Sequence, residues 1–249
     1  MNIAVEGQKY EGKSTLAFFL ACRIKDRTNA YKIWIFDPKW AFRNPAPKCA
    51  GKIRIVHSTD DLDEFESLLS TEGDAVAFRP RMSFDEDDQE AIADDFRSFA
   101  ESVQLERWLK NPPERPIILV VDEAYNLQRG AQVHPVLAAA NRLATKGKIY
   151  IIQAVHGPKE IAPLMRRQQD EFYLFRQNDP TDIDSIRERC GDEAAEIVAN
   201  LPQHHVLVFK ARDRKFEVWS DPRGWYCRIS EPEHKENGSA QRLENTVGV

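Results

Sequence analysis

One short stretch near the start of the chain has the residue types and spacing of a phosphate-binding loop. Its pattern is Gly-x-x-x-x-Gly-Lys-Ser/Thr, matched at every fixed position by Gly7, Gln8, Lys9, Tyr10, Glu11, Gly12, Lys13 and Ser14. The glycines allow the backbone N–H groups to point at phosphate oxygens, and a following helix adds its dipole. Lys13 is expected to reach the β- and γ-phosphates and Ser14 to hold Mg²⁺. The sequence therefore predicts an ATP site from Gly7 to Thr15.

An acidic pair later in the chain supplies the other residues that ATP hydrolysis needs. Residues 117–121 are all apolar, as in a strand buried on both faces of a parallel sheet, and Asp122 and Glu123 follow directly. At the carboxyl edge of such a sheet, Asp122 can orient a magnesium-bound water. Glu123 can accept a proton from the water that attacks the phosphate. We therefore predict ATP hydrolysis with ATP and Mg²⁺ as cofactors, in preference to phosphoryl transfer to a small molecule.

The elements that must position these residues alternate along the chain. Apolar runs predict strands at 3–6, 33–36, 75–78, 117–121, 150–154, 172–175, 206–209 and 216–219. Helical periodicity predicts helices at 14–25, 60–70, 89–109 and 135–145. The pattern indicates an α/β fold with a mainly parallel central sheet flanked by helices. Residues 210–215 separate the last two strands and predict a C-terminal β-hairpin.

Length and composition indicate one domain. The chain has 249 residues and 42% hydrophobic content, which suits one ATPase domain over residues 1–230, and the polar residues 231–249 are expected to form a flexible tail. No apolar run approaches the ~18 residues of a membrane span, and no signal peptide precedes the loop. We expect a cytoplasmic protein without direct membrane insertion. Reduced thiols are expected for the scattered Cys22, Cys49, Cys190 and Cys227.

Charge is distributed unevenly around the net value of −5. Residues 31–54 and residues 142–167 each carry a local excess of five positive charges, whereas residues 60–101 carry fifteen acidic residues against three arginines. Such polarity fits a body with one face toward nucleic-acid phosphates, and it also fits ordinary solvated helices. Both interpretations stay open at this point.

Several ordered segments together resemble the FtsK–HerA superfamily of P-loop ATPases. Glu123 directly after Asp122, with a strand between the two motifs, is typical of the additional-strand, catalytic-glutamate class. The other segments are Phe36-Asp37-Pro38-Lys39, Thr145-Lys146-Gly147-Lys148, the strand from Tyr150 to Pro158, Phe175-Arg176-Gln177-Asn178-Asp179 and Asn200-Leu201-Pro202. The resemblance covers most of residues 1–220, and its sharpest part is the phosphate loop.

This resemblance implies a RecA-like P-loop NTPase that forms a homo-oligomeric ring and translocates double-stranded DNA, as in the genome-packaging ATPases of membrane-containing viruses. Little sequence follows residue 230, so we expect a bare core that docks onto capsid or vertex proteins, in the host cytoplasm or on the virion. The family's polar sensor falls on Gln153 or His156. A cation that completes a neighbour's site falls on Arg142, Lys146 or Lys148.

Two other functions remain possible from the sequence. The chain could be an ATP-dependent assembly or regulatory factor of the phage morphogenesis type that never moves DNA. A small-molecule kinase is disfavoured by Glu123 and by the absence of an arginine-rich lid. DNA-stimulated ATP turnover would separate the first alternative from a motor.

Overall fold

A computed structural model describes residues 1–39, 41–42, 53–57, 75–79, 89–103, 105, 110–111, 114–129, 132–144 and 149–220. The elements in chain order are β1 (Asn2–Glu6), α1 (Lys13–Thr28), β2 (Lys32–Phe36), β3 (Ile53–His57), β4 (Ala75–Arg79), α3 (Gln89–Ser102), β5 (Ile117–Val121), η2 (Ala124–Leu127), β6 (Gln128–Arg129), β7 (Gln132–Val133), α5 (Pro135–Ala144), β8 (Ile149–Val155), η3 (Pro158–Glu160), α6 (Pro163–Arg166), β9 (Glu171–Phe175), α7 (Pro180–Cys190), α8 (Asp192–Asn200), β10 (Val206–Lys210) and β11 (Lys215–Trp219).

Within the described residues, the strands form a 9-stranded sheet in the order β11-β10-β9-β1-β8-β5-β2-β4-β3. All pairings from β9 to β3 are parallel, and β10 runs antiparallel to both β9 and β11. This confirms the predicted fold class, including the C-terminal hairpin. Strand β8 lies between β1, which leads into the phosphate loop, and β5, which leads into Asp122. The carboxyl ends of these three neighbours therefore meet at one edge.

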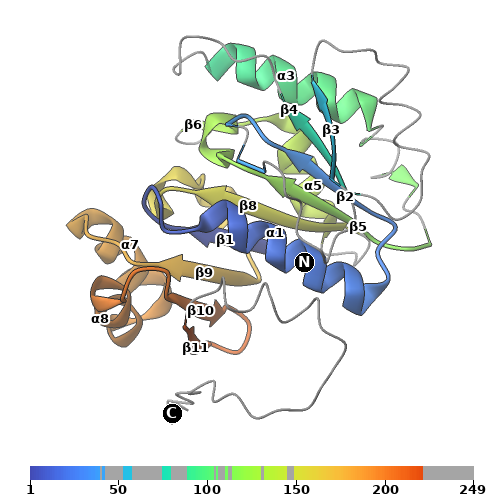
Figure 1. The fold of residues 1–249 in the computed structure, drawn as a ribbon. Helices are drawn as coiled ribbons and strands as arrows, with labels where there is room; N and C mark the ends of the chain where they lie inside the picture. Colours follow the sequence, from blue (N-terminus) through green and yellow to red (C-terminus); the bar gives the residue numbers. More distant parts are fainter. Residues whose placement is uncertain are drawn as a thin grey trace.

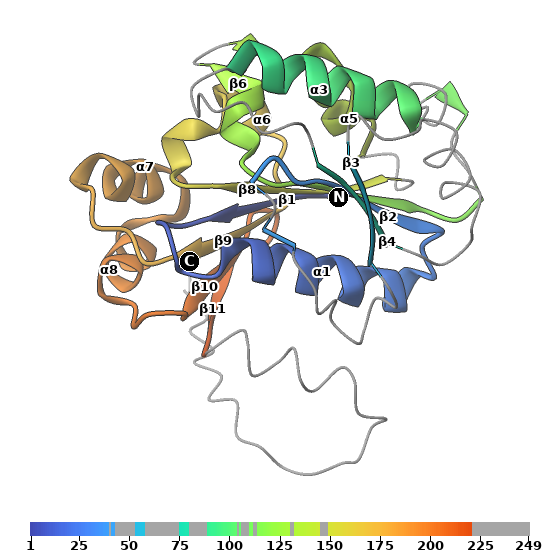
Figure 2. The ribbon, with the colours of Figure 1, turned by 45° about the horizontal axis from the view of Figure 1, so that its top comes forward.

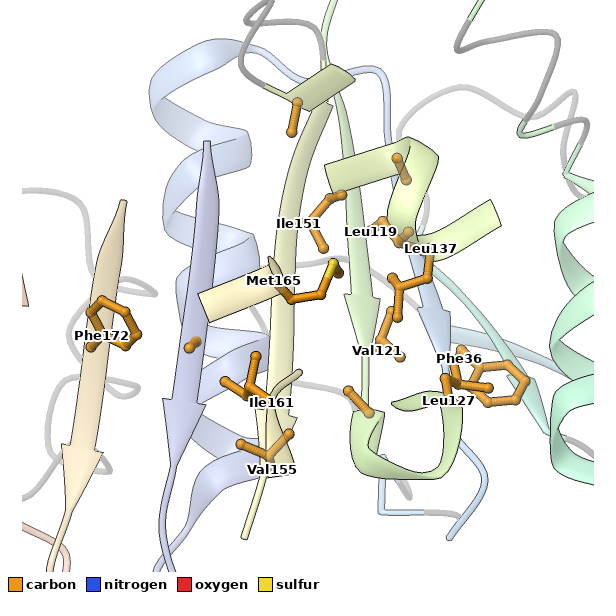
Figure 3. Packing of buried hydrophobic residues seen from close by; sticks show 14 of the residues in the cluster. Phe36, Leu119, Val121, Leu127, Leu137, Ile151, Val155, Ile161, Met165 and Phe172 are labelled. Atoms are coloured by element: carbon orange, nitrogen blue, oxygen red, sulfur yellow. The ribbon is translucent and has the colours of Figure 1, made fainter. Parts of the chain in front are cut away.

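Helices cover both faces of the sheet (Figures 1 and 2). Helix α1 lies on one face, and α3, α5 and α6 lie on the other, while α7 and α8 lie beside β9 and β10. The strands are buried on both sides because alternate residues enter two separate cores. In β5, for example, Leu119 belongs to the core under α5, whereas Ile118 and Val120 belong to the core under α1. Figure 3 shows Leu137 and Met165 packing from α5 and α6 over Leu119 and Ile151.

The predicted elements agree with the observed ones except at a few places. The helix expected over 89–109 ends at Ser102, and three groups of elements were not predicted, namely β3, the short η2, β6, β7, η3 and α6, and the helices α7 and α8. The helix expected at 60–70 and the tail at 231–249 lie outside the described residues. No helix in the described part of the chain is long and apolar enough to span a membrane.

Candidate nucleotide site

The phosphate loop follows β1, and two of its residues have a left-handed backbone conformation. Tyr10 has a φ of 67° and Gly12 a φ of 102°, and this alternation turns successive N–H groups toward one side of the loop. Gly7 starts the loop because a Cβ there would lie 2.6 Å from Cβ of Phe175. Helix α1 begins at Lys13, so its amino end points at the space inside the loop.

Lys13 is buried and makes two contacts inside this space. Its Nζ donates to the carbonyl oxygen of Gln8 at 3.0 Å and lies 3.2 Å from Nδ1 of His156. A lysine ammonium has no acceptor, so Nδ1 of His156 accepts this hydrogen and Nε2 carries the ring hydrogen. Burial lowers the pKa of Lys13, although the nearby carboxylates of Glu123 and Asp122 oppose that effect.

Ser14 and Asp122 are arranged as a magnesium site requires. The Ser14 hydroxyl lies 3.1 Å and 3.0 Å from the two carboxylate oxygens of Asp122. Asp122 is only 1% exposed, and burial together with the charges of Glu123 and Asp37 raises its pKa to about 7. A buried carboxylate whose charge is this costly, next to a hydroxyl, is a fitting place for a divalent cation held through oxygen atoms. The residues present therefore fit Mg²⁺.

Two side chains, the His156 ring and the Lys39 ammonium, lie against Glu123. Its Oε2 lies 2.9 Å from Nε2 of His156 and 3.5 Å from Nζ of Lys39. Its backbone has a φ of 50°, a strained conformation that turns the side chain away from the line of β5. Burial alone would raise the pKa of Glu123, but the contact with His156 and the charges of Lys39 and Lys13 hold the pKa below its usual value.

These groups line one cavity of about 420 Å³ at the carboxyl edge of the sheet. From the predicted ATP site, Lys9, Tyr10, Gly12, Lys13, Ser14 and Thr15 line it. Asp122, Glu123 and His156 line its other side, together with Lys39. Tyr10 is 89% exposed at the rim. Nucleophile activation, charge neutralisation and phosphate binding are therefore available within one opening.

Sequence reasoning missed Lys39, which it counted among the cations of segment 31–54. The turn that carries it is built on Asp37, which is fully buried and accepts hydrogen bonds from the N–H groups of Ala41 at 2.7 Å and Phe42 at 3.2 Å. Nε of Arg79 lies 3.4 Å from the same carboxylate. Lys32, another cation of that segment, is fully buried, so it is out of reach of a nucleic acid, whereas Lys39 lines the cavity.

Gln153, one of two sensor candidates, lies away from the cavity. It shares a face of β8 with Ile151 and Val155, toward α5. Its Oε1 accepts from Nε2 of Gln128 at 2.9 Å, and its Nε2 donates to Oδ1 of Asn141 at 3.2 Å. His156, the other candidate, is the one that the structure brings to Lys13 and Glu123.

The phosphate loop is also fastened on its other side, at Glu11. The Oε1 of Glu11 lies 3.4 Å from Nη2 of Arg176, and its Oε2 accepts from the N–H of His204 at 3.2 Å. Nδ1 of His204 lies 3.0 Å from the carbonyl oxygen of Glu11. Arg176 precedes α7 and His204 follows α8, so the chain contacts the same loop residue, Glu11, both before and after this pair of helices.

The candidates for a cation acting on a neighbour's site lie elsewhere. Arg142 is exposed near the end of α5, next to Asn141, whose carbonyl accepts from Nδ2 of Asn2 at 3.1 Å. Asn2 begins β1, whereas the loop follows the end of β1, so Arg142 lies at the opposite edge of the sheet from its own cavity. Lys146 and Lys148 lie outside the described residues. The described residues contain no cluster of three or more His, Cys, Asp or Glu side chains suited to a metal ion.

No protein-family model and no curated protein sequence matches the chain. Solved structures do resemble it. The genome packaging NTPase B204 from Sulfolobus turreted icosahedral virus 2, in complex with ATP-γS, superposes with a TM-score of 0.61 at 19% identity, covering 87% of this chain and 95% of that one. VirB4 of Thermoanaerobacter pseudethanolicus gives a TM-score of 0.57 at 13% identity, covering 84% and 87%. The chain thus shares its fold with these two proteins, which agrees with the predicted resemblance at the level of the fold.

Proposed function

We propose that the chain is an ATPase that moves double-stranded DNA, as a homo-oligomeric ring of the genome-packaging kind. The observation that carries the ATPase part is the convergence of Lys13, Asp122 and Glu123 on one cavity beside a phosphate loop. A cavity of about 420 Å³ is large enough for a nucleotide, which fits the usual range of ligand sites.

Each side chain has a distinct task in hydrolysis. The loop amides and Lys13 bind the phosphates, and Ser14 with Asp122 would hold Mg²⁺, which supplies neutralising charge at the β- and γ-phosphates. Glu123 orients the attacking water and accepts its proton. His156, through its contact with Oε2, fixes the direction of the Glu123 carboxylate.

The motor part rests on the fold and on charge. The fold is shared with a genome packaging NTPase of a virus, and at 19% identity this likeness concerns the fold. Arg167, which directly follows α6, is exposed and offers a cation for DNA phosphates. Charge developing on the transferred phosphoryl calls for a further cation, and Arg142 of a neighbouring copy, or Lys146 or Lys148, would supply it in a ring.

The test is ATP turnover of the full chain with and without double-stranded DNA, with the oligomeric state recorded in the same buffer. We expect hydrolysis without any acceptor, stimulation by DNA and a closed oligomer. Hydrolysis that ignores DNA in a confirmed oligomer would favour an assembly factor instead. Absence of phosphate release would refute the ATPase proposal, and labelled phosphate found on a small acceptor would identify a kinase.

A further inference from the structure

We infer that Lys39 binds the γ-phosphate within its own subunit, and that it leaves Glu123 to do so. This inference rests on the proposed ATPase function and adds a ligand that distinguishes ATP from ADP. It depends on where Lys39 lies, on what holds its turn in place, and on what its ammonium contacts.

Lys39 lines the same cavity as the phosphate loop and lies next to Glu123. Its Nζ is 3.5 Å from Oε2 of Glu123 and 5.8 Å from the ring centre of Tyr125. The side chain is 38% exposed, whereas that of Glu123 is 9% exposed. The ammonium is therefore the more accessible partner of this pair, and it lines the same opening as Lys13 and Ser14.

The base of the Lys39 side chain is fixed, so only its flexible end has to move. Asp37, two residues before it, is fully buried and accepts the N–H groups of Ala41 and Phe42. Phe42 is buried against Phe18 of α1, with ring centroids 5.8 Å apart. Because both sides of Lys39 are anchored, its four-carbon stem stays pointed at the cavity.

Glu123 does not need Lys39 to stay oriented. Its Oε2 is already 2.9 Å from Nε2 of His156, and the lysine is the longer of the two contacts. A bound γ-phosphate presents more negative charge to Lys39 than one carboxylate does, and phosphate oxygens are strong acceptors for an ammonium. Transfer of Lys39 to the phosphate also removes one cation from Oε2 of Glu123, which keeps its contact with His156, so the carboxylate accepts a proton from water more readily. ADP offers no such partner and leaves Lys39 on Glu123.

The experiment compares the affinities of the full chain for a non-hydrolysable ATP analogue and for ADP, each with Mg²⁺, by calorimetry. Four proteins are measured, namely the parent, Lys39→Met, Lys39→Arg and Lys215→Met. Lys215 is exposed on β11 and is absent from the cavity lining, so its variant is the matched control. We expect Lys39→Met to lose ~10-fold in affinity for the ATP analogue, as for one charged hydrogen bond, and to bind ADP as the parent does.

The conservative Lys39→Arg variant should keep most of the preference for the ATP analogue, and Lys215→Met should keep all of it. A structural role for the Lys39–Glu123 pair predicts equal losses for both nucleotides, and that result would overturn the inference. An unchanged ratio in Lys39→Met would overturn it as well. If Lys39→Met does not fold, Lys39→Gln is read by the same ratio. A parent that binds neither nucleotide refutes the ATPase proposal and this inference together, whereas with a parent that binds both, the ratio tests the role of Lys39 alone.

Discussion

Gln153 and His156 stand three residues apart at the end of β8, yet they belong to opposite kinds of polar environment. Gln153 is fully buried among amides, with both ends of its side chain bonded to Gln128 and Asn141. His156 is partly exposed between Lys13 and Glu123, at the wall of an open cavity. One environment is neutral and complete, and the other is charged and open to a ligand.

The difference teaches how one strand can serve structure and chemistry at once. A satisfied amide network in a low-dielectric interior fixes the packing of β8 against α5, and it has no free group to offer a substrate. A cluster of opposite charges at the cavity wall keeps groups whose partners can be exchanged. Four predictions test this division, from the largest expected effect to the smallest.

Among the charged residues of the cavity, substitution of Glu123 is expected to cause the largest loss of ATP turnover. Glu123→Gln removes the proton acceptor and keeps the shape, so we expect ATP turnover to fall by ~10²–10⁴-fold while ATP still binds. Lys13→Ala is the contrasting variant and should lose tight ATP binding itself. Phosphate release and nucleotide binding are measured on both. Turnover of Glu123→Gln at the parental rate would remove Glu123 as the base.

Substitution of Arg142 tests whether a residue of a neighbouring subunit takes part in ATP hydrolysis. It lies beside Asn141, far from its own cavity, so Arg142→Ala should lower turnover by ~10²-fold or more only if the side chain acts in trans. Mixing inactive Arg142→Ala with inactive Glu123→Gln should then restore activity, since some interfaces combine an intact base with an intact finger. A fully active Arg142→Ala protein would shift the role to Lys146 or Lys148.

His156 should matter less than the base that it orients. We expect His156→Ala to lower turnover by less than the ~10²–10⁴-fold lost with the base, because Glu123 keeps its charge and loses its direction. His156→Gln offers both an acceptor and a donor and should retain more activity than the alanine variant. The two rates are compared at saturating ATP. Equal rates for both variants would contradict a role that depends on hydrogen bonding.

Gln153 should leave turnover nearly unchanged and lower stability instead. Gln153→Leu leaves Oδ1 of Asn141 without its donor in a buried site, which costs about 1–3 kcal/mol of unfolding free energy. Denaturant unfolding and ATP turnover are measured on the same preparation. A large loss of turnover with unchanged stability would return Gln153 to the sensor role and break the comparison.

More of the fold than of the candidate site could be predicted from the sequence. Continuous apolar runs such as residues 117–121 specify buried parallel strands, and the glycine-lysine motif specifies the loop between β1 and α1. Helix α7 was missed although Asp179 caps it and Pro180 begins it, which are ordinary signals of a helix start. The helix itself carries few large apolar residues, Ile183 and Ile186, so its sequence shows no strong helical period.

The positions of Gln153 and Lys39 show what local pattern leaves undetermined. The period of two along β8 already places Gln153 on the face of Ile151 and Val155, and that parity could have assigned it to the core. Lys39 gave no such signal. Its place over Glu123 depends on Arg79 of β4 and on a buried Asp37, which are brought together only by the sheet order.

The two contacts of Glu11 connect the phosphate loop to the helices α7 and α8. Residues 177–203 form a loop of chain that is tied at both ends, by Arg176 and by His204, to one residue of the phosphate loop. The exposed charged side chains of these residues are mostly acidic, and they include Asp184, Glu188, Asp192, Glu193 and Glu196. Force applied to α7 or α8 would therefore reach the phosphate loop through these side-chain contacts as well as through the backbone. It would act next to the peptide groups that we propose bind the phosphates.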